Sequence, residues 1–508
     1  MLEAYVKKIL SSEVYDIAIE TPLEAAPFLS ARLNADISFK REDMQPIHSF
    51  KIRGAYNRMV KLSERERKRG VLAASAGNHA QGVALAASRL GIQATIVMGL
   101  NTPTIKVEAV QRLGAEVILR GDTYDDAEQH AHSIGDRNGA TIVPPYDDPA
   151  VIAGQGTVGV EILNQFEGDP DAIFVPVGGG GLVAGIAAYV KYLKPQVKVI
   201  GVEASGSDCL NQALIAGRRV RLRTDGMDLF ADGASVAQVG KRPFQIARRH
   251  VDQMIVVTTD EICAAIKDVF DDTRTIAEPA GALAVAGLKR YLKDKPGSNR
   301  RYVAVISGSN VNFDRLRHIS ERAEFGESRE ALLGVSIPEK PGSFRRLCQA
   351  LGKRAITEFN YRLNDQRTAQ VFLGIQVSDL EERKNVVNVL TKRGYVVEDM
   401  TDNEMAKLHV RHMVGGAAST ASGEVLYRFE FPERPGALRT FLTEVGVDWN
   451  ISLFHYRNHG AAWGRVLVGF RAVNQDKRAL RKYLDRIGYR YWDCLLYTSP
   501  SPRDQRGS

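Results

Sequence analysis

Apolar and polar positions follow two different periods in the first two thirds of the chain. Between Asp36 and about Arg322, short and nearly continuous apolar runs alternate with longer segments of helical spacing. The runs predict strands at 70–74, 94–98, 116–119, 172–177, 198–203 and 302–306, and the segments predict helices at 81–90, 104–113 and 182–192. Strands that are apolar on both faces are typical of a parallel sheet covered by helices on both sides. The pattern therefore predicts an α/β fold.

The last third of the chain carries an internal repeat. The segment VSIPEKPGSF at 335–344 matches FEFPERPGAL at 429–438, so Pro435 corresponds to Pro341, 94 residues earlier. A second match, FNYR at 359–362 with FHYR at 454–457, has an offset of 95 residues. Each copy predicts a strand, a Pro-Gly turn, an amphipathic helix and a strand. The repeat therefore predicts a separate α+β region made of two similar units.

These patterns divide the chain into domains. We expect a first domain at 1–322, a linker at 323–331, one repeat unit at 332–415 and a second at 421–493, joined by a loop at 415–420. Residues 494–508 resemble a translated sequencing adapter, and we exclude them from the fold; a genuine disordered tail is the alternative.

Composition and charge narrow the class of protein. The 508 residues are 44% hydrophobic and 25% charged, as in ordinary globular proteins, and the net charge of +8 is scattered rather than clustered. We therefore expect no nucleic-acid partner. No apolar stretch of ~18 residues and no signal-peptide pattern is present, which predicts a cytoplasmic protein without a membrane partner. Four widely spaced cysteines favour neither structural zinc nor a disulfide framework.

Three segments carry candidate chemistry. Lys51 lies in SFKIRGA at 49–55, a small-residue turn SAGNHAQG occupies 75–82, and four glycines at 178–181 separate an apolar run from a helical one. Consecutive glycines before a helix allow backbone N–H groups to converge on an anion. A reactive lysine, an asparagine turn and a phosphate-binding loop suit an aldehyde cofactor with a phosphate group. The alternatives are a surface lysine and a tight packing turn.

Together with VGGGGL at 177–182 and SGSNV at 307–311, these motifs occur in the order seen in one family. From about Ser12 to Asp493 the chain resembles the biosynthetic threonine dehydratases (threonine ammonia-lyases), of the tryptophan-synthase-β-like class of pyridoxal-phosphate enzymes. The resemblance implies a two-lobed catalytic domain followed by a regulatory domain of paired ACT-like units. If 494–508 is an adapter, it also implies that about twenty residues of the native C-terminus are missing.

The resemblance assigns roles to individual residues. Lys51 would bind pyridoxal 5'-phosphate covalently and then move the substrate α-proton. Asn78 would bind the ring hydroxyl of the cofactor, and Ser307 would face its ring nitrogen. The residues that would bind the cofactor phosphate are Gly178, Gly179, Gly180, Gly181 and Leu182. Those that would bind the substrate carboxylate are Ser75, Ala76, Gly77, Asn78 and His79. A hydroxyl at Ser307 does not hold the ring nitrogen protonated, which disfavours transamination and suits elimination. Glu278 matches a motif near the cofactor, or is only an acid at a helix N-terminus.

Two departures separate the chain from related serine racemases. Those enzymes have a serine as second base where this chain has Ala76, so we expect poor racemisation. Their divalent-metal site needs a carboxylate six residues after a glutamate equivalent to Glu203, and that position is Cys209 here. The resemblance therefore predicts no metal site.

The function that the resemblance implies is dehydration and deamination of L-threonine to 2-oxobutanoate and ammonia, with slower action on L-serine. It would be the first step toward isoleucine. Isoleucine would inhibit and valine would antagonise through the paired units, in a homotetramer; the alternative is that these units are a structural appendage for oligomerisation. Tyr361 and Tyr456 are the candidate regulatory contacts, and the alternative is that both are core residues. The alternatives are a β-replacement synthase of the same fold and a catalytically dead amino-acid sensor.

Overall fold

The computed structural model forms two compact units, Met1–Gly326 and Glu327–Ser508, which we describe separately. The structure describes residues 2–493 apart from a set of gaps, which are 101, 122, 225–226, 295–299, 327–328, 341, 363–366, 404–423, 433–437, 439–440, 443–448, 450, 458–462, 472–475 and 488. The predicted loop at 415–420 and the segment at 494–508 lie outside the described residues. No described helix is long and apolar enough to cross a membrane.

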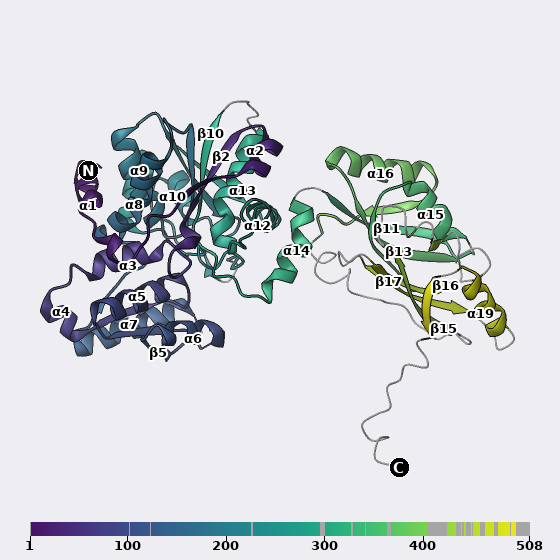
Figure 1. The fold of residues 1–508 in the computed structure, drawn as a ribbon, viewed down its shortest axis with the longest axis horizontal. Coiled ribbons are helices and arrows are strands. Elements are labelled where there is room, and N and C mark those ends of the chain that lie inside the picture. The colour runs from purple at the N-terminus through teal and green to yellow at the C-terminus, as the bar shows by residue number, and fades with distance from the viewer. Residues whose placement is uncertain are drawn as a thin grey trace, which may run out of the picture. The chain divides into compact units, whose positions relative to one another are not determined.

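The first unit contains a six-stranded sheet of order β1-β2-β10-β7-β8-β9 (Figure 1). Its strands are β1 (Leu23–Ala25), β2 (Asp36–Arg41), β10 (Arg301–Ile306), β7 (Ala172–Pro176), β8 (Lys198–Ala204) and β9 (Gln253–Val257). All neighbours are parallel except β1, which pairs antiparallel with β2 at the edge. The predicted parallel α/β architecture is confirmed, and the antiparallel edge strand is an addition to it.

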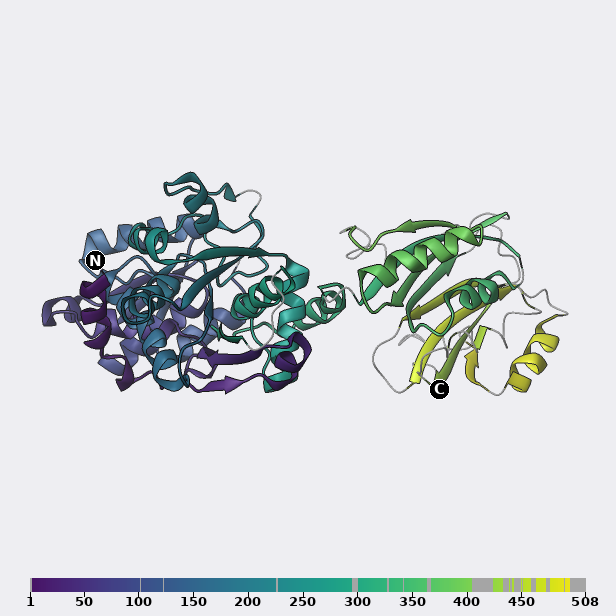
Figure 2. The same cartoon turned by 90° about the horizontal axis from the view of Figure 1, so that it is seen from above.

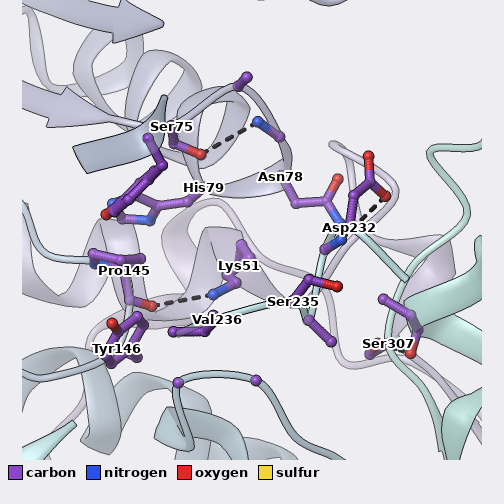
Figure 3. Close-up of a pocket in the computed structure, with 18 of the residues that line it drawn as sticks. Lys51, Ser75, Asn78, His79, Pro145, Tyr146, Asp232, Ser235, Val236 and Ser307 are labelled. Carbon is purple, nitrogen blue, oxygen red and sulfur yellow. Dashed lines mark hydrogen bonds between the residues drawn. The ribbon is translucent and has the colours of Figure 1, made fainter. Parts of the chain in front are cut away.

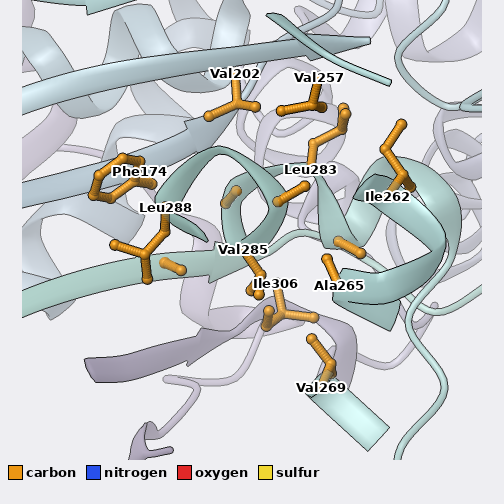
Figure 4. Close-up of a cluster of buried hydrophobic side chains, with 14 of the residues drawn as sticks. Phe174, Val202, Val257, Ile262, Ala265, Val269, Leu283, Val285, Leu288 and Ile306 are labelled. Atoms are coloured by element: carbon orange, nitrogen blue, oxygen red, sulfur yellow. The ribbon is translucent and has the colours of Figure 1, made fainter. Parts of the chain in front are cut away.

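Alternate residues of the central strands pack into two different cores, because successive side chains of a strand point to opposite faces. Phe174 of β7 belongs to one core with residues of α13 (Pro279–Asp294) and α12 (Thr259–Thr273), and Figure 4 shows it beside Leu288 of α13. Its neighbour Ile173 packs on the opposite face with residues of α8 (Pro149–Gln165) and α9 (Gly181–Leu193). Helices therefore cover both faces of the sheet.

A second, four-stranded parallel sheet of order β5-β4-β3-β6 forms a smaller lobe of the same unit. Its strands are β5 (Glu116–Leu119), β4 (Ala94–Met98), β3 (Val71–Ala74) and β6 (Thr141–Ile142), with helices α5 (Asn78–Leu90), α6 (Thr104–Arg112) and α7 (Tyr124–Asn138). Ala73 packs with residues of α5, whereas Ala74 packs with residues of α7. The predicted strands thus divide between two sheets, which a periodicity pattern cannot reveal.

The second unit places both repeats in one eight-stranded sheet of order β14-β11-β13-β12-β16-β17-β15-β18. The first repeat supplies β11 (Glu330–Pro338), α15 (Ser343–Leu351), β12 (Ile356–Arg362), β13 (Thr368–Gln376), α16 (Leu380–Lys392) and β14 (Val396–Asp399). The second supplies β15 (Glu424–Pro432), β16 (Ile451–Arg457), β17 (Trp463–Arg471), α19 (Asp476–Ile487) and β18 (Arg490–Asp493). The repeats join where β12 and β16 pair antiparallel. Figure 2 shows these strands and helices from above.

Two details differ from the sequence expectations. Helix α14 (Arg315–Gly326) continues past the predicted end of the first domain, and β11 already begins at Glu330, so the predicted linker at 323–331 is largely ordered structure. Tyr361 and Tyr456 are 2% and 1% exposed and belong to the hydrophobic core of the second unit. In this conformation neither ring is open to a ligand.

Candidate active site

The carboxyl ends of β3, β7 and β10 open onto one cavity of about 680 Å³ in the first unit. Ligands of open α/β folds bind beyond the carboxyl ends of strands. The cavity wall includes every residue to which the sequence assigned a catalytic, cofactor or carboxylate role, which are Lys51, Ser75, Ala76, Gly77, Asn78, His79, Gly178, Gly179, Gly180, Gly181, Leu182 and Ser307. Segments separated by more than two hundred residues therefore meet at one site.

Lys51 is the first residue of α3 (Lys51–Met59), and its amine points into this cavity, where Nζ donates to the carbonyl oxygen of Pro145 at 3.2 Å (Figure 3). Burial lowers the pKa of the amine to about 8, although the nearby carboxyl of Glu278 opposes this shift. A fraction of the amine is therefore neutral near neutral pH, which a lysine needs in order to attack an aldehyde.

The glycine loop, residues 178–181, connects β7 to the N-terminus of α9 and leaves no room for side chains. A Cβ on Gly178 would lie 2.7 Å from the backbone oxygen of Ala234, and one on Gly179 would lie 2.1 Å from the ring of Tyr146. Gly180 has a φ of +87°, a backbone conformation that residues with a side chain rarely adopt. The loop thus exposes backbone N–H groups at a helix N-terminus, as a phosphate group requires. The residues present fit pyridoxal phosphate.

Replacing Gly178 with alanine should weaken cofactor binding by about tenfold or more, because the new methyl group collides with backbone atoms that cannot turn away. Titration of the cofactor-free chain with pyridoxal phosphate, followed by absorbance, measures the change. Gly135→Ala in α7 is the control, since its nearest atom would be 3.3 Å away, and it should leave the affinity unchanged. Equal affinity of Gly178→Ala and the unmodified chain would refute the assignment.

The turn between β3 and α5 lines the cavity with residues 75–77. The N–H of Gly77 donates to Oγ of Ser75 at 3.2 Å, which folds the turn inward. His79 is buried, with Nε2 2.8 Å from the carbonyl oxygen of Val143. Burial and then the charge of Lys51 lower the pKa of His79 to about 3, so the imidazole stays neutral. The imidazole of His79 therefore binds the backbone of Val143, and the contact of His79 with a substrate carboxylate stays a prediction.

Ser307 follows β10 and is 4% exposed. Its hydroxyl lies 3.4 Å from the carbonyl oxygen of Ala280, which accepts a weak hydrogen bond, and the residue lines the cavity. Glu278 also lines the cavity, and its Oε1 would lie 2.6 Å from a Cβ on Gly308, the residue after Ser307. Ser307 thus lines the cavity with a neutral hydroxyl, and its contact with a ring nitrogen stays a prediction.

Glu278 is 7% exposed, and its Oε1 accepts a hydrogen bond from Nδ2 of Asn78 at 2.6 Å. Burial, followed by the charge of Asp232, raises the pKa of Glu278 to about 7. Glu278 immediately precedes α13, but its carboxyl is turned to the cavity. Of the two readings left open by the sequence, the contact with Asn78 supports a place in the site.

The raised pKa of Glu278 predicts a pH-dependent stability. The folded chain keeps a proton that the unfolded chain releases above about pH 4.5, so the free energy of unfolding should fall by about 3 kcal/mol as pH rises from about 4.5 to about 7. Glu278→Gln should remove this part of the slope. Denaturant unfolding of the cofactor-free chain at several pH values measures it. Buried Glu203 titrates in both chains, so the difference between them isolates Glu278; identical slopes would contradict the prediction.

Several residues that line the cavity received no role in the sequence analysis. Asn310 lies inside the motif SGSNV but was given no role, and Tyr146 follows Pro145 in a segment without a recognised motif. Lys106 of the small lobe and Asp232 of the large lobe form a 2.8 Å ion pair at the cavity wall. Only the quoted motif offered a signal, and only for Asn310.

Glu203 and Cys209, which correspond to the metal-site positions of related serine racemases, make hydrogen bonds within the protein. The carboxylate of Glu203 accepts the backbone N–H groups of Leu210 and Asn211 at 2.9 and 2.8 Å. Sγ of Cys209 lies 3.6 Å from the carbonyl oxygen of Gly178. Among the described residues, no three metal-ligating side chains gather at one point.

Comparisons with known proteins agree with this geometry. A family described as pyridoxal-phosphate dependent enzyme matches residues 14–308, and one described as C-terminal regulatory domain of threonine dehydratase matches residues 321–410 and 415–495. "L-threonine dehydratase biosynthetic IlvA" of Burkholderia multivorans is 51% identical over 490 residues, covering 96% of both chains. The mitochondrial threonine dehydratase of Saccharomyces cerevisiae is 46% identical, covering 96% of this chain and 87% of its own.

Solved structures also resemble part of the chain. The processed form of threonine deaminase isoform 2 from Solanum lycopersicum is 48% identical, with a TM-score of 0.62, and the match covers 63% of this chain and 88% of that one. Maize serine racemase is 31% identical, with a TM-score of 0.58, and the match covers 62% and 95%. The chain therefore belongs to the biosynthetic threonine dehydratases, pyridoxal-phosphate dependent enzymes with a C-terminal regulatory domain.

Proposed function

We propose that this chain converts L-threonine to 2-oxobutanoate and ammonia, acts more slowly on L-serine, and does so as a cytoplasmic homotetramer. One water is lost from the substrate and one is regained on hydrolysis, so the products balance the substrate. The observation that carries the proposal is the amine of Lys51, which points into the same cavity that the glycine loop lines. Relatives named threonine dehydratase over almost the whole chain support it.

Different residues of the cavity have different roles in the proposed reaction. Bound pyridoxal phosphate supplies the electron sink that stabilises negative charge at the substrate α-carbon. The N–H groups of the glycine loop, with Leu182 at the start of α9, hold the phosphate, and the turn from Ser75 to His79 holds the substrate carboxylate. The amine of Lys51 takes the α-proton. Ser307 leaves the ring nitrogen without a forced proton, which favours loss of the β-hydroxyl over transamination.

We propose that the second unit is the sensor for isoleucine, with valine as antagonist. Its two repeats meet in one sheet, so a ligand at either repeat acts on a shared structure. The hydroxyl of Tyr361 donates to Glu339 at 2.5 Å, close to the start of α15. Since Tyr361 and Tyr456 are buried, a regulatory role for them requires a second conformation that the effector binds more tightly.

The experiment is 2-oxobutanoate formation from L-threonine by the purified chain, with and without L-isoleucine. Turnover that isoleucine suppresses supports both the catalytic and the sensor assignments. Turnover that isoleucine does not change refutes the sensor assignment alone. Bound cofactor without turnover, but with a new product when a thiol is added, would favour the β-replacement synthase. A chain without cofactor or turnover that still binds isoleucine would be the dead sensor.

A further inference from the structure

Asn310 connects two segments of the cavity wall through one amide group. Its Nδ2 donates to the carbonyl oxygen of Ile47 at 2.8 Å and to Oδ1 of Asn78 at 2.7 Å. Ile47 lies four residues before Lys51, and Asn78 begins α5 in the small lobe. Neighbouring backbone contacts hold the same junction, since the N–H of Ser309 donates to the carbonyl of His48 at 3.0 Å. The Asn310 amide is therefore held in a fixed place.

One backbone atom, the carbonyl oxygen of Ile47, determines which way the amide groups of Asn310 and Asn78 point. A backbone carbonyl such as that of Ile47 can only accept a hydrogen bond, so Asn310 must turn its nitrogen toward it. That nitrogen then meets Asn78, which must present its oxygen. The nitrogen of Asn78 is left on the other side, where it donates to Oε1 of Glu278 at 2.6 Å. Orientation is thus passed from Ile47 through Asn310 to Asn78.

We propose that Asn310 is a positioning residue that fixes the Asn78 amide, so that Asn78 offers an N–H group, and not its carbonyl oxygen, to the ring hydroxyl of the cofactor. One hydrogen of the Asn78 nitrogen is used by Glu278, and the second remains for the ring oxygen. A turned amide would set its own oxygen against that of the ring. The inference rests on the proposed function, because it takes pyridoxal phosphate as the ligand of this cavity.

The variant Asn310→Asp reverses the donor at this position while keeping the shape of the side chain. At pH 8, above the pKa of Glu278, the new carboxylate only accepts, so the Asn78 amide lies between two acceptors and is no longer held in one orientation. We expect the affinity of the cofactor-free chain for pyridoxal phosphate to fall by about tenfold. We also expect the midpoint of denaturant unfolding of that chain to fall.

A second substitution separates orientation from general damage. In Asn310→Asp/Glu278→Gln the new amide at 278 can donate to a turned Asn78, so part of the lost unfolding midpoint should return while the cofactor affinity stays low; the hydrogen bond to the carbonyl of Ile47 stays lost in both variants. Glu278→Gln alone is the reference for the double variant, because its oxygen still accepts from Asn78 and any change in affinity that it causes by itself is subtracted. Recovery of affinity together with stability in the double variant would show that Asn310 has only a structural role and would overturn the proposal.

Asn57→Ala is the control for loss of a buried amide. Asn57 accepts from the N–H of Glu13 at 3.1 Å and donates to the carbonyl of Ala150 at 2.7 Å, and it does not line the cavity. Its removal should lower stability and leave cofactor affinity unchanged; a matching loss of affinity would count against a specific role for Asn310. If the unmodified chain binds no cofactor, the proposed function fails. If it binds cofactor and Asn310→Asp binds equally well, only this inference fails.

Discussion

Lys51→Ala should abolish 2-oxobutanoate formation, with kcat lowered by about 10⁴-fold or more, since one substitution removes both the nucleophile and the base. The cofactor absorbance near ~410 nm should disappear with it, because no other lysine that the structure describes in the cavity wall lies beside the glycine loop; Lys106 is paired with Asp232. Single-turnover kinetics and absorbance spectra of the purified variant measure both effects. The cavity itself should remain, because Lys51 contributes one 3.2 Å hydrogen bond to it.

Lys51→Arg is the control for charge. It keeps a cation at the start of α3 but offers no amine that becomes neutral near neutral pH, so it should fold and remain inactive. Both variants can still bind pyridoxal phosphate noncovalently, because the glycine loop is unchanged. Turnover by Lys51→Ala within tenfold of the unmodified chain would refute the assignment of Lys51.

Arg53→Met should destabilise the first unit by about 3–5 kcal/mol, because it leaves buried carboxylates without their partner. Arg53 is fully buried and binds Glu42 with two hydrogen bonds of 2.7 Å, while its Nη1 and Nη2 reach Glu161 at 2.5 and 2.9 Å. Lys40 joins the same group 2.6 Å from Glu161. These contacts fix α3 against α8 and so set where Lys51 lies. Denaturant unfolding measures the loss.

Arg58→Met is the matched control on the same helix. Arg58 pairs with Asp148 at 3.5 Å, and both side chains are about one fifth exposed, so its removal should cost only about 0–1 kcal/mol. Equal losses for the two variants would show that burial of Arg53 does not govern its contribution. If a folded Arg53→Met chain keeps its catalytic rate, the buried ion pairs of Arg53 stabilise the first unit but do not position Lys51.

The local parts of the fold were predictable from the sequence. The strands at 94–98 and 116–119 match β4 and β5 because an apolar run of β-favouring residues is a local signal. The repeat predicted two similar units, and both are present in one sheet. The candidate site residues could be named because the lysine and glycine motifs occur in the order of a known family, and the structure places these residues around one cavity; their individual roles stay predictions. The separation into two sheets needed tertiary contacts that no local pattern contains.

The residues that hold the site in place were not predictable in the same way. Nothing in the sequence indicates that Arg53 meets Glu161, which is 108 positions away, or that Asn310 meets Ile47, 263 positions away. Such pairs depend on how strands are ordered in a sheet. Tyr361 and Tyr456 show the converse, because equivalent positions in a repeat predict equivalent environments, and both rings are buried in the core.

The most direct test of the account is the release of 2-oxobutanoate and ammonia from L-threonine by the chain loaded with pyridoxal phosphate, compared with Lys51→Ala. The unmodified chain should release equal amounts of the two products, and the variant none above background. A loaded, folded chain that leaves L-threonine unchanged, or a variant that matches it, would contradict the account.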